Sequence, residues 1–522
     1  MSRKLAVPKV TIFLSILLVI KALLLVLTAF ITSTLINKAL KKEELTVNII
    51  ILSLVIFSQI VIQIIYLHLK NHSSVKEEAK LKHTVFDSLL EKEVVSLDNY
   101  HSGELSNYYL VDVANINNGN LGLIPSICQV IAKVTLSFVG ILFLDWKYIL
   151  LIVVVMLGIS IISCSIYKKL KYYERKALEE DGKINALMQE NMQNIRIIKA
   201  LDATKSASLK VLSKLDENKQ IKTKKNNYLE IAQGGFTLAV NLFYLSTLIY
   251  ALLAIKNGKM DYGSLYSMMQ LVVILTNQLM LFSSYVNRFN QYKTSKTRIS
   301  KLLELNDETP NEEIADFDSI VFENVCFNYE KEVIKDLNLV INKDDMLVIE
   351  GPSGSGKSTV LYLLLGFIKP QKGRIYVKKG DIEVTLSKST RNLFTYVSQA
   401  NILFRGTLFE NIRFFNPNVT DSEIIEVLDA VNLKNEILKN HSHLDISLNE
   451  QGKGLSVGQI QRVLIAISIL QNKKIMLLDE FNSALDYKNE QDIIKILIKL
   501  GKTIIFVSHH HLEVEGVKSV SL

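Results

Sequence analysis

One short segment of the chain combines closely spaced glycines with a lysine and hydroxyl side chains, which suits it to binding phosphate groups. It reads Gly351, Pro352, Ser353, Gly354, Ser355, Gly356, Lys357, Ser358 and Thr359, and it fits the spacing G-x-x-x-x-G-K-[ST]. Glycines let backbone N–H groups close around phosphate oxygens, Lys357 brings a positive charge, and Ser358 offers a hydroxyl to Mg²⁺. A strand-like run at 346–350 precedes the segment, and an apolar helix is predicted to begin near Thr359. This order predicts a nucleotide site.

Two carboxylates end a second strand-like run further along the chain. Asp479 and Glu480 follow residues 475–478, and the carboxyl ends of parallel strands are where such sheets bind ligands. We predict that Asp479 holds Mg²⁺ and that Glu480 polarises an attacking water as a general base. On its own, such a run is more often a strand that enters a solvated loop. The phosphate-binding segment upstream favours the chemical interpretation.

A third strand-like run, residues 503–508, is followed by histidines. Its position favours His509 as an imidazole that contacts the γ-phosphate of a bound nucleotide. His510 and His511 extend the sequence to three consecutive histidines, so a metal-binding or merely solvated run stays an alternative.

The elements that must position these residues lie between residues 319 and 522. Short β-type runs are separated there by helix-length segments, at 320–327, 346–350, 394–397, 475–478 and 503–507. Such alternation predicts an α/β domain with a mostly parallel sheet. An acidic linker over residues 301–318 precedes this domain.

The first 300 residues have a different texture. A bilayer-spanning helix needs roughly 20 mostly apolar residues. Six stretches meet this requirement, at 10–36, 47–69, 121–144, 148–167, 234–255 and 262–286. We therefore predict an all-α transmembrane six-helix bundle over residues 1–300, followed by the α/β domain. The first stretch is too long for a signal-peptide core and lacks a cleavage site, so we expect it to remain as a membrane anchor.

Charge and cysteine content narrow the functional classes. The chain has 60 basic and 52 acidic residues, a formal net charge of +8. Basic residues gather in the second and fourth connections and after the sixth stretch, which predicts that these segments and both termini are cytoplasmic. This bias explains the charge without a nucleic-acid partner. The three cysteines lie far apart and indicate neither a disulfide framework nor a zinc site.

Together, these motifs resemble those of ATP-binding cassette (ABC) transporters, in particular half-size exporters that carry a six-helix membrane domain ahead of a nucleotide-binding domain. The motif that distinguishes the family is its signature, L-S-G-G-Q. Residues 455–459 read L-S-V-G-Q and stand 20 residues before Asp479. Residues 101–105 and 190–200 resemble the coupling-helix regions of such exporters. The resemblance covers nearly the whole chain and implies a P-loop NTPase domain with a helical signature subdomain.

The resemblance implies roles for further residues. Tyr329 corresponds to the aromatic side chain that stacks on adenine, and Gln399 to the glutamine that meets both magnesium and the membrane domain. Asp486 belongs to the D-loop, and His509 corresponds to the switch histidine. The implied cofactors are ATP and Mg²⁺, with Mg²⁺ ligands Ser358, Gln399 and Asp479.

The resemblance also implies a dimer. Two cassettes sandwich two ATP molecules head to tail, and each site joins the phosphate-binding segment of one chain to the signature of the other. The signature residues are Ser456, Val457, Gly458 and Gln459. A second half-transporter is therefore expected, and a homodimer is favoured over a heterodimer. Transport then follows alternating access, in which ATP closes the cassettes and hydrolysis resets them.

Three departures from the family pattern affect these expectations. Val457 replaces a glycine, and its β-branched side chain restricts the backbone and adds bulk that faces a phosphate. Asn482 replaces a threonine, which we treat as a mild change. Thirteen residues follow His509, so the terminal elements of the cassette are expected to be shortened or absent.

The transported substrate is the least determined feature. Lys21 lies inside the first apolar stretch, and an intramembrane cation indicates function by default, with snorkelling to the interface as the alternative. Candidates for a polar path, or for interhelical hydrogen bonds, are Gln59, Gln63, Asn241, Gln270, Asn277 and Gln278. Family habit favours a peptide, bacteriocin or other natural product over a lipid or hydrophobic drug.

A regulatory role is the remaining alternative. In some heterodimers one half binds nucleotide without efficient hydrolysis, and Val457 with the short tail favours that interpretation. The retained Glu480 opposes it, because a degenerate site usually loses this carboxylate first. In either case we expect the chain in the plasma membrane of a bacterium, in contact with membrane lipid.

Overall fold

The chain folds into two compact units. The computed structural model describes residues 5–329, 331–352, 354–399, 403–449, 454–481, 487–508 and 517–522. The helical unit comprises Met1–Phe86 and Leu105–Leu303, and the α/β unit comprises Asp87–Glu104 and Glu304–Leu522. The α/β unit is thus built from two separate segments of sequence.

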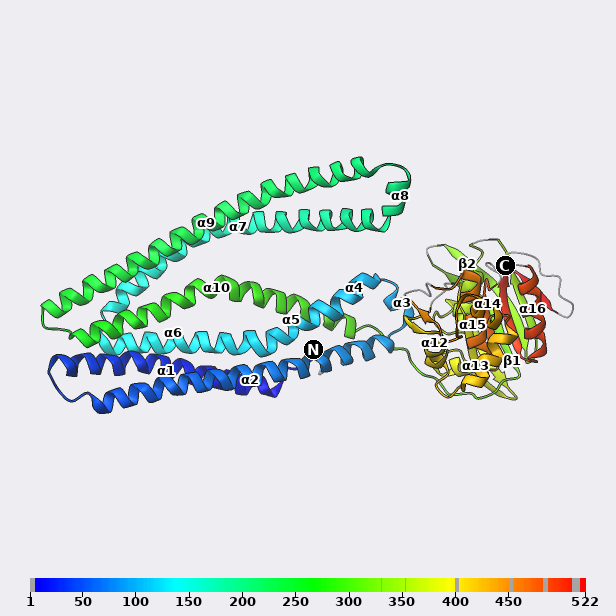
Figure 1. Ribbon diagram of the computed structural model, residues 1–522, viewed down its shortest axis with the longest axis horizontal. Coiled ribbons are helices and arrows are strands. Elements are labelled where there is room, and N and C mark those ends of the chain that lie inside the picture. Colours follow the sequence, from blue (N-terminus) through cyan, green and yellow to red (C-terminus); the bar gives the residue numbers. More distant parts are fainter. Residues whose placement is uncertain are drawn as a thin grey trace. The chain divides into compact units, whose positions relative to one another are not determined.

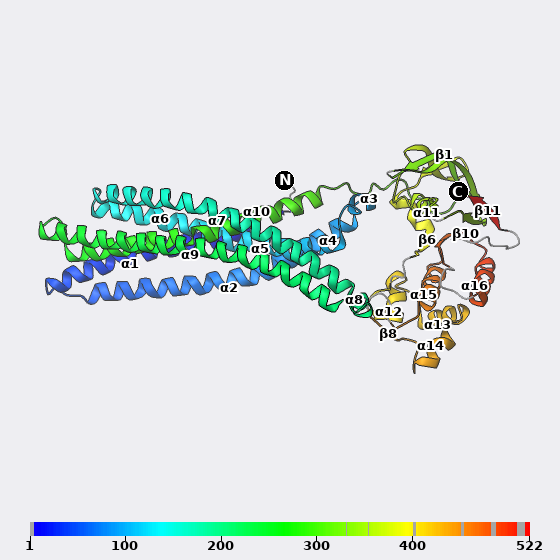
Figure 2. The same cartoon turned by 90° about the horizontal axis from the view of Figure 1, so that it is seen from above.

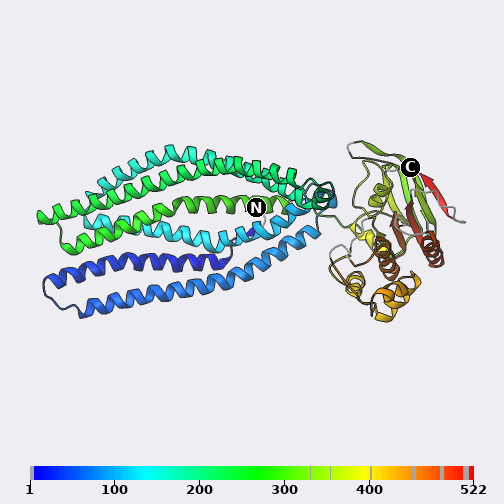
Figure 3. The same cartoon turned by 45° about the horizontal axis from the view of Figure 1, so that its top comes forward.

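Long helices make up the helical unit, and they run side by side in Figure 1 and Figure 3. They are α1 Lys9–Leu40, α2 Thr46–Leu90, α6 Ile124–Leu144, α7 Tyr148–Gln193, α9 Thr204–Lys256 and α10 Tyr262–Leu303. Each apolar stretch predicted from the sequence lies in one of these helices, the third one beginning just before α6. Helices α2, α7, α9 and α10 continue well beyond their apolar parts.

Length and composition make four helical stretches suitable for crossing a membrane among the residues searched. They are Lys9–Leu40, Thr46–Leu90, Gly103–Leu144 and Thr204–Lys256. Helix α1 packs against α6 and α10, and α7 packs against α9. A buried core joins these helices through Ile141, Tyr148, Phe243, Met268 and Leu271. The large apolar side chains that remain exposed on α1 and α2 are those expected of a lipid-facing surface.

The helix that leads into α6 contains two π-helical turns. The segments in chain order are α4 Ser102–Asn107, η2 Tyr108–Asp112, α5 Val113–Asn118 and η3 Gly119–Leu123. A π-turn inserts a residue into the α-helical hydrogen-bonding pattern, and such turns occur frequently at functional sites. The short helix α8, Ile195–Ala200, lies at the turn between α7 and α9 (Figure 1).

Three sheets form the framework of the α/β unit. A five-stranded sheet of parallel pairs has the order β11-β3-β10-β9-β6, a four-stranded antiparallel sheet has the order β2-β1-β4-β5, and β7 pairs with β8. The strands are β1 Ser319–Asn328, β2 Glu332–Asn342, β3 Met346–Glu350, β4 Lys372–Lys379, β5 Ile382–Thr385, β6 Phe394–Val397, β7 Gly406–Thr407, β8 Ser447–Leu448, β9 Ile475–Asp479, β10 Thr503–Ser508 and β11 Lys518–Ser521. All five strand-like runs found in the sequence form strands.

Helices surround the strands of the α/β unit, and Figure 2 shows α12, α13, α14 and α15 close to one another. They are α11 Lys357–Leu364, η4 Lys388–Leu393, α12 Leu408–Phe415, α13 Asp421–Ala430, α14 Lys434–Asn440, α15 Val457–Leu470 and α16 Tyr487–Lys499. Side chains of β9 alternate between two cores, because successive residues of a strand point to opposite faces. Ile475 and Leu477 pack into the core that includes α11, and Met476 and Leu478 pack into the core that includes α12 and α13.

The short segment that follows α2 is fastened to the linker ahead of β1. Lys92 is almost fully buried, and its Nζ donates to the carbonyl oxygen of Leu305 and to Oδ1 of Asp307, both at 2.6 Å. The backbone N–H of Glu308 donates to Glu91 at 2.8 Å. The carboxylate of Glu308 in turn accepts two hydrogen bonds from Arg391, at 2.8 and 2.6 Å. This is how residues 87–104, which include α3 Val94–Leu97, become part of the α/β unit.

Candidate functional site

The phosphate-binding segment lies between β3 and α11, as its sequence predicts. Gly356 has φ of 96°, and a Cβ atom added there would lie 2.6 Å from Cγ1 of Val333 in β2. Only glycine fits both the left-handed backbone and the close approach of β2. Lys357 is almost fully buried, and its Nζ donates to the carbonyl oxygens of Gly351 and Pro352 at 2.8 and 3.0 Å.

This segment fits a bound nucleotide phosphate. The Oγ atom of Ser355 is buried and has no hydrogen-bond partner among the described residues. Gly356 caps the amino end of α11 without a side-chain hydrogen bond, so the first N–H groups of the helix are available to an anion. An orphaned hydroxyl, a buried lysine and a helix amino end therefore converge on one small volume.

Asp479 brings the end of β9 to the same place. Its side chain is almost fully buried, Oδ1 accepts a hydrogen bond from Oγ of Ser358 at 3.1 Å, and Oδ2 accepts one from the Tyr396 hydroxyl at 3.3 Å. Burial raises the pKa of the Asp479 carboxyl, and the neighbouring charge of Glu480 adds to the rise, against the lowering effect of the two hydrogen bonds. Burial also raises the pKa of Tyr396, so this hydroxyl stays protonated and donates.

The Ser358 hydroxyl and the Asp479 carboxylate are hard oxygen ligands of the kind that Mg²⁺ prefers. No group of three or more His, Cys, Asp or Glu side chains suited to a metal occurs in the described part of the chain. Mg²⁺ is commonly held by one or two protein oxygens together with nucleotide phosphates. The residues present therefore fit a nucleotide-bound magnesium rather than an all-protein metal site.

Glu480 follows Asp479 in a strained backbone conformation, with φ of 49°. Its N–H donates to the carbonyl oxygen of Val507 in the adjacent strand β10, at 3.3 Å. Its carboxylate is half-buried, and Oε2 accepts a hydrogen bond from Nε2 of Gln399 at 2.6 Å. A non-glycine residue in the left-handed region costs on the order of 1–3 kcal/mol and persists where its surroundings impose it. The strain turns the Glu480 side chain towards Gln399.

Register explains why distant residues meet here. In the parallel sheet, Asp479 of β9 pairs with Val507 of β10, and Ser508 of β10 pairs with Glu350 of β3. The three strands therefore end at one edge, next to the phosphate-binding segment. His509 is the next residue after β10 but lies outside the described residues, as do Ser353, Asn482 and Asp486.

The aromatic candidate lies just beyond β1. The Tyr329 side chain is 59% exposed, and its ring contacts the Phe327 ring edge-to-face with a centroid separation of 4.9 Å. The following strand, β2, carries the Val333 that packs against Gly356. Tyr329 therefore lies shortly before Val333, which contacts the phosphate-binding segment. Its ring is exposed to solvent, as stacking on a base requires.

The signature residues form the amino end of α15. Ser456 is the N-cap, its Oγ accepts from the Gln459 N–H at 3.3 Å, and Oε1 of Gln459 accepts from the Ser456 N–H at 2.9 Å. This reciprocal pair is a capping box. Val457 is the first helical residue, and its side chain is 53% exposed. The valine therefore leaves the helix start intact, and Gly458 follows it inside the helix.

A buried ion pair ties this helix start to α14. Arg462 donates to both carboxylate oxygens of Glu436, at 2.8 and 2.6 Å, and Nε2 of Gln459 donates to Oε2 of Glu436 at 3.2 Å. The Arg462 side chain is only 5% exposed. Sequence reasoning missed both Glu436 and Tyr396. The position of Tyr396, three residues before Gln399, was a signal that could have identified it. Nothing in the sequence pairs Glu436 with Gln459 and Arg462, which lie 23 and 26 positions later.

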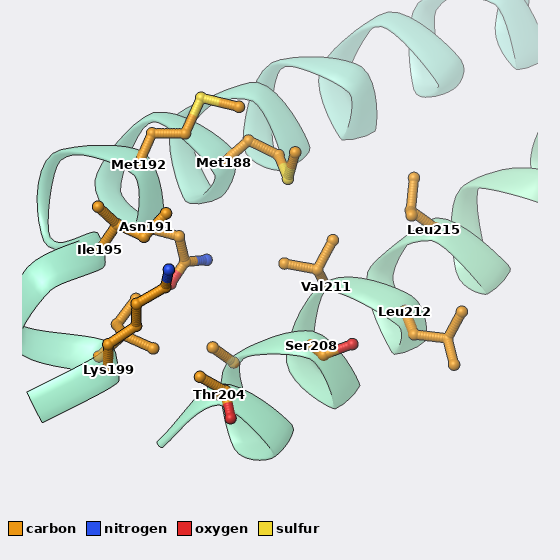
Figure 4. A pocket seen from close by; sticks show the side chains of 12 residues that line it. Met188, Asn191, Met192, Ile195, Lys199, Thr204, Ser208, Val211, Leu212 and Leu215 are labelled. Atoms are coloured by element: carbon orange, nitrogen blue, oxygen red, sulfur yellow. The ribbon is translucent and has the colours of Figure 1, made fainter. Parts of the chain in front are cut away.

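The segments that resemble coupling regions lie at the ends of long helices. Residues 101–105 enter α4, and residues 190–200 span the turn from α7 to α8. At that turn lies a pocket of about 430 Å³ (Figure 4). Met188 and Met192 line it from α7, and Val211 and Leu212 line it from α9. The pocket is apolar, which suits contact with another protein surface rather than a polar ligand.

Comparison with known proteins gives a consistent result. A family described as ABC transporter transmembrane region matches residues 10–279, and a family described as ABC transporter matches residues 334–483. The chain is 25% identical to a multidrug resistance ABC transporter ATP-binding and permease protein of Lactococcus lactis subsp. lactis over 437 residues, which are 82% of this chain and 74% of that one. It is 27% identical to the ATP-dependent lipid A-core flippase of Neisseria meningitidis serogroup A over 436 residues, which are 81% and 70% of the two chains.

A solved structure supports the fold. A bacterial Atm1-family ABC exporter with ATP bound superposes with a TM-score of 0.81 at 21% sequence identity, and the match covers 96% of this chain and 91% of that one. Both the helical first half and the α/β second half predicted from the sequence are confirmed by these matches.

Proposed function

This chain belongs to the ABC transporter family, and we propose that it forms one half of an exporter in which ATP hydrolysis moves a substrate out of the cytoplasm. Membership and the relatives make it an ATP-hydrolysing ABC exporter. The observation that carries the residue assignment is the pair of hydrogen bonds Ser358–Asp479 and Gln399–Glu480, which assemble one constellation from distant parts of the sequence.

We assign the following roles to the chain's own residues. ATP is the substrate, and bound Mg²⁺ would supply positive charge beside its phosphates. Lys357 exchanges its carbonyl partners for phosphate oxygens, and Ser355 donates its free hydroxyl. The proposed magnesium ligands are Ser358, Gln399 and Asp479. Glu480 accepts the proton of the attacking water, and His509 contacts the γ-phosphate.

Gln399 holds the side chain of Glu480 in place. Nε2 of Gln399 donates to Oε2 of Glu480 at 2.6 Å. This bond leaves Oε1 of Gln399, the amide atom that could bind Mg²⁺, outside the contact. The contact therefore sets the proposed base beside a proposed magnesium ligand.

A second copy of the chain completes the site in this proposal. Ser456, Gly458 and the amino end of α15 present N–H groups to the nucleotide of the partner. The exposed Val457 side chain leaves these groups in place, which favours activity over a purely regulatory role. The helical unit is proposed to span the plasma membrane six times with both termini in the cytoplasm.

The proposal is least specific about the class of the transported substrate. A peptide, bacteriocin or other natural product was favoured by family habit, and a lipid or hydrophobic drug is the alternative. The relatives are named for multidrug resistance and for lipid A-core, which supports giving the alternative equal weight.

The test is ATPase turnover of the purified chain in lipid, with Glu480→Gln as the matched inactive variant and light scattering on the same sample. Glu480-dependent turnover by a homodimer is the expected result. A folded homodimer without turnover contradicts the proposal and favours a regulatory half. Turnover that appears only after a different half-transporter is added contradicts the homodimer alone.

A further inference from the structure

Two lysines lie inside the apolar stretches of the helical unit. Lys21 belongs to α1 and Lys133 to α6. At 1.5 Å per residue they lie about 16 and 18 Å from the cytoplasmic ends of their stretches, near the middle of a bilayer's hydrocarbon core. The six stretches contain no Asp or Glu at all. The two positive charges therefore have no counter-ion of their own within the predicted spans, and such charges are costly and usually functional.

The structure brings these lysines into one polar cluster. Helices α1 and α6 pack together, with Phe30 of α1 against Gly140 of α6, and Leu18 of α1 shares a buried cluster with Leu121. Lys21 and Lys133 lie between these two contacts, at similar heights along the two helices. Nζ of Lys21 donates to Oε1 of Gln63 on α2, at 2.7 Å. One turn away, Nε2 of Gln59 is buried and has no hydrogen-bond partner among the residues that the structure describes. Neither lysine forms an ion pair within the described residues, so the cluster offers several hydrogen-bond donors and no anion.

A second pair of cations lies towards the cytoplasmic ends of α2 and α10. Arg288 and Lys70 converge on the π-turn η3, where a Cβ added to Gly122 would lie 3.4 Å from Nη2 of Arg288 and 3.8 Å from Nζ of Lys70. No carboxylate pairs with either cation in the part of the chain that the structure describes. A polar cavity of about 330 Å³ adjoins Arg288 and is lined also by Asn118 and Tyr292, with no acidic residue.

We propose that the helical unit binds a ligand that carries an acidic group, a carboxylate or phosphate, on an apolar body. The Arg288–Lys70 pair receives the acidic group at the cytoplasmic edge, and the Lys21–Lys133 cluster holds it within the membrane. This inference names a substrate class and so rests on the exporter function proposed above. Charge-assisted hydrogen bonds strengthen in a low-dielectric surrounding, so an anion suits these donors better than a neutral or cationic cargo does.

Binding of two matched probes tests the inference. The full chain is placed in phosphatidylcholine discs and titrated with NBD-labelled dodecanoic acid or with its neutral methylamide, and protein-free discs give the background. We expect the acid to bind about tenfold more tightly than the amide, the scale of one charge-assisted contact. The double variant Lys21→Met, Lys133→Met should bind both probes alike. Equal affinities in the unaltered chain, or selectivity that survives the double variant, would overturn the proposal.

Controls separate charge from folding and identify the source of the acidic group. Lys21→Arg with Lys133→Arg keeps both charges and should keep the selectivity. Lys38→Met, near the carboxyl end of α1, affects a lysine outside the cluster that donates to Asn48, and it should not alter the selectivity. If phosphatidylglycerol added to the discs competes with the acid, a lipid headgroup is the ligand. If it does not compete, a free amphiphile is the ligand.

The same discs also separate this inference from the exporter proposal. Acid selectivity without Glu480-dependent ATP turnover supports the anion site and contradicts the exporter. Turnover without acid selectivity supports the exporter and contradicts the anion site.

Discussion

The tie between α14 and the start of α15 provides the sharpest test of how the signature is positioned. Glu436→Ala removes the two carboxylate oxygens that accept from Arg462, whose side chain is 5% exposed, and with them the acceptor of the Gln459 amide. Stripping a buried charge of its partner costs roughly 3–5 kcal/mol. The Glu436 side chain is 36% exposed, and Arg462 keeps the carbonyl oxygens of Asn432 and Gly458. We therefore expect a smaller loss, about 2 kcal/mol.

That loss should appear in turnover rather than in nucleotide affinity. Glu436 lies on α14 and binds Arg462 at the start of α15, so the KM for ATP should change by less than about twofold. In the proposed dimer the start of α15 serves the partner's site, so kcat should fall by about thirtyfold. Glu436→Gln keeps one carbonyl acceptor and should lie between the two.

The assay is steady-state ATP hydrolysis in lipid, combined with hydrogen exchange of the peptide that carries residues 455–462. Glu426→Ala is the matched control, because this side chain lies on α13 and is exposed. Wild-type turnover in Glu436→Ala, with unchanged exchange at the start of α15, would refute the positioning argument. A large rise in KM with unchanged kcat would show that Glu436 affects the nucleotide site of its own chain, and it would refute the prediction that only turnover changes.

Further predictions concern the nucleotide pocket, acid stability and the linker. Gly356→Ala forces a Cβ against Val333 and a left-handed φ on alanine, so binding of a fluorescent ATP analogue should weaken by about tenfold; unchanged affinity would mean that β2 yields. Hydrogen bonds from Lys379 and Lys343 hold the pKa of Asp316 well below its usual range. The ionised carboxylate therefore stabilises the fold at pH values above its unfolded pKa, about 4, and this stabilisation is lost as the pH falls further. The Tm difference between the unaltered chain and Lys379→Met should shrink as the pH falls from 6 towards about 3, and a constant difference would contradict this prediction. Lys92→Met removes two hydrogen bonds from a buried site. It should lower the unfolding free energy of the α/β unit by about 1–3 kcal/mol, as measured by denaturant titration. Lys369→Met, which removes an ion pair made by an exposed lysine, is the control.

Local patterns in the sequence predicted the framework of the α/β unit well. Met346–Glu350 and Phe394–Val397 form strands with the predicted bounds, because short apolar β-branched runs bounded by turns depend on near neighbours only. The helix after the phosphate-binding segment begins at Lys357 rather than near Thr359, with Gly356 as its N-cap. After the histidines, residues 518–521 form β11, which pairs with β3.

Pairings between distant segments could not be predicted in the same way. The meeting of Ser358 with Asp479 followed from the rule that parallel strands end at one edge, but the Gln399–Glu480 contact depends on a strained φ that no sequence pattern encodes. Lys133 has the same sequence character as Lys21 and was overlooked, because its meaning depends on α1 packing against α6. The membrane boundaries and the roles of the site residues stay predictions.

The split composition of the α/β unit has a consequence for biosynthesis. Lys92 and its partner Asp307 are separated by 215 residues, so at 5–20 residues per second the ribosome needs roughly 10–40 s to supply the second after the first. Throughout that interval the segment after α2 must wait, while the remaining membrane helices are made and inserted. A charged lysine keeps the waiting segment hydrated and unattached to lipid or to nascent helices. Burial of Lys92 is therefore a late folding step, in which the newly made nucleotide-binding half packs against a segment that was synthesised long before it.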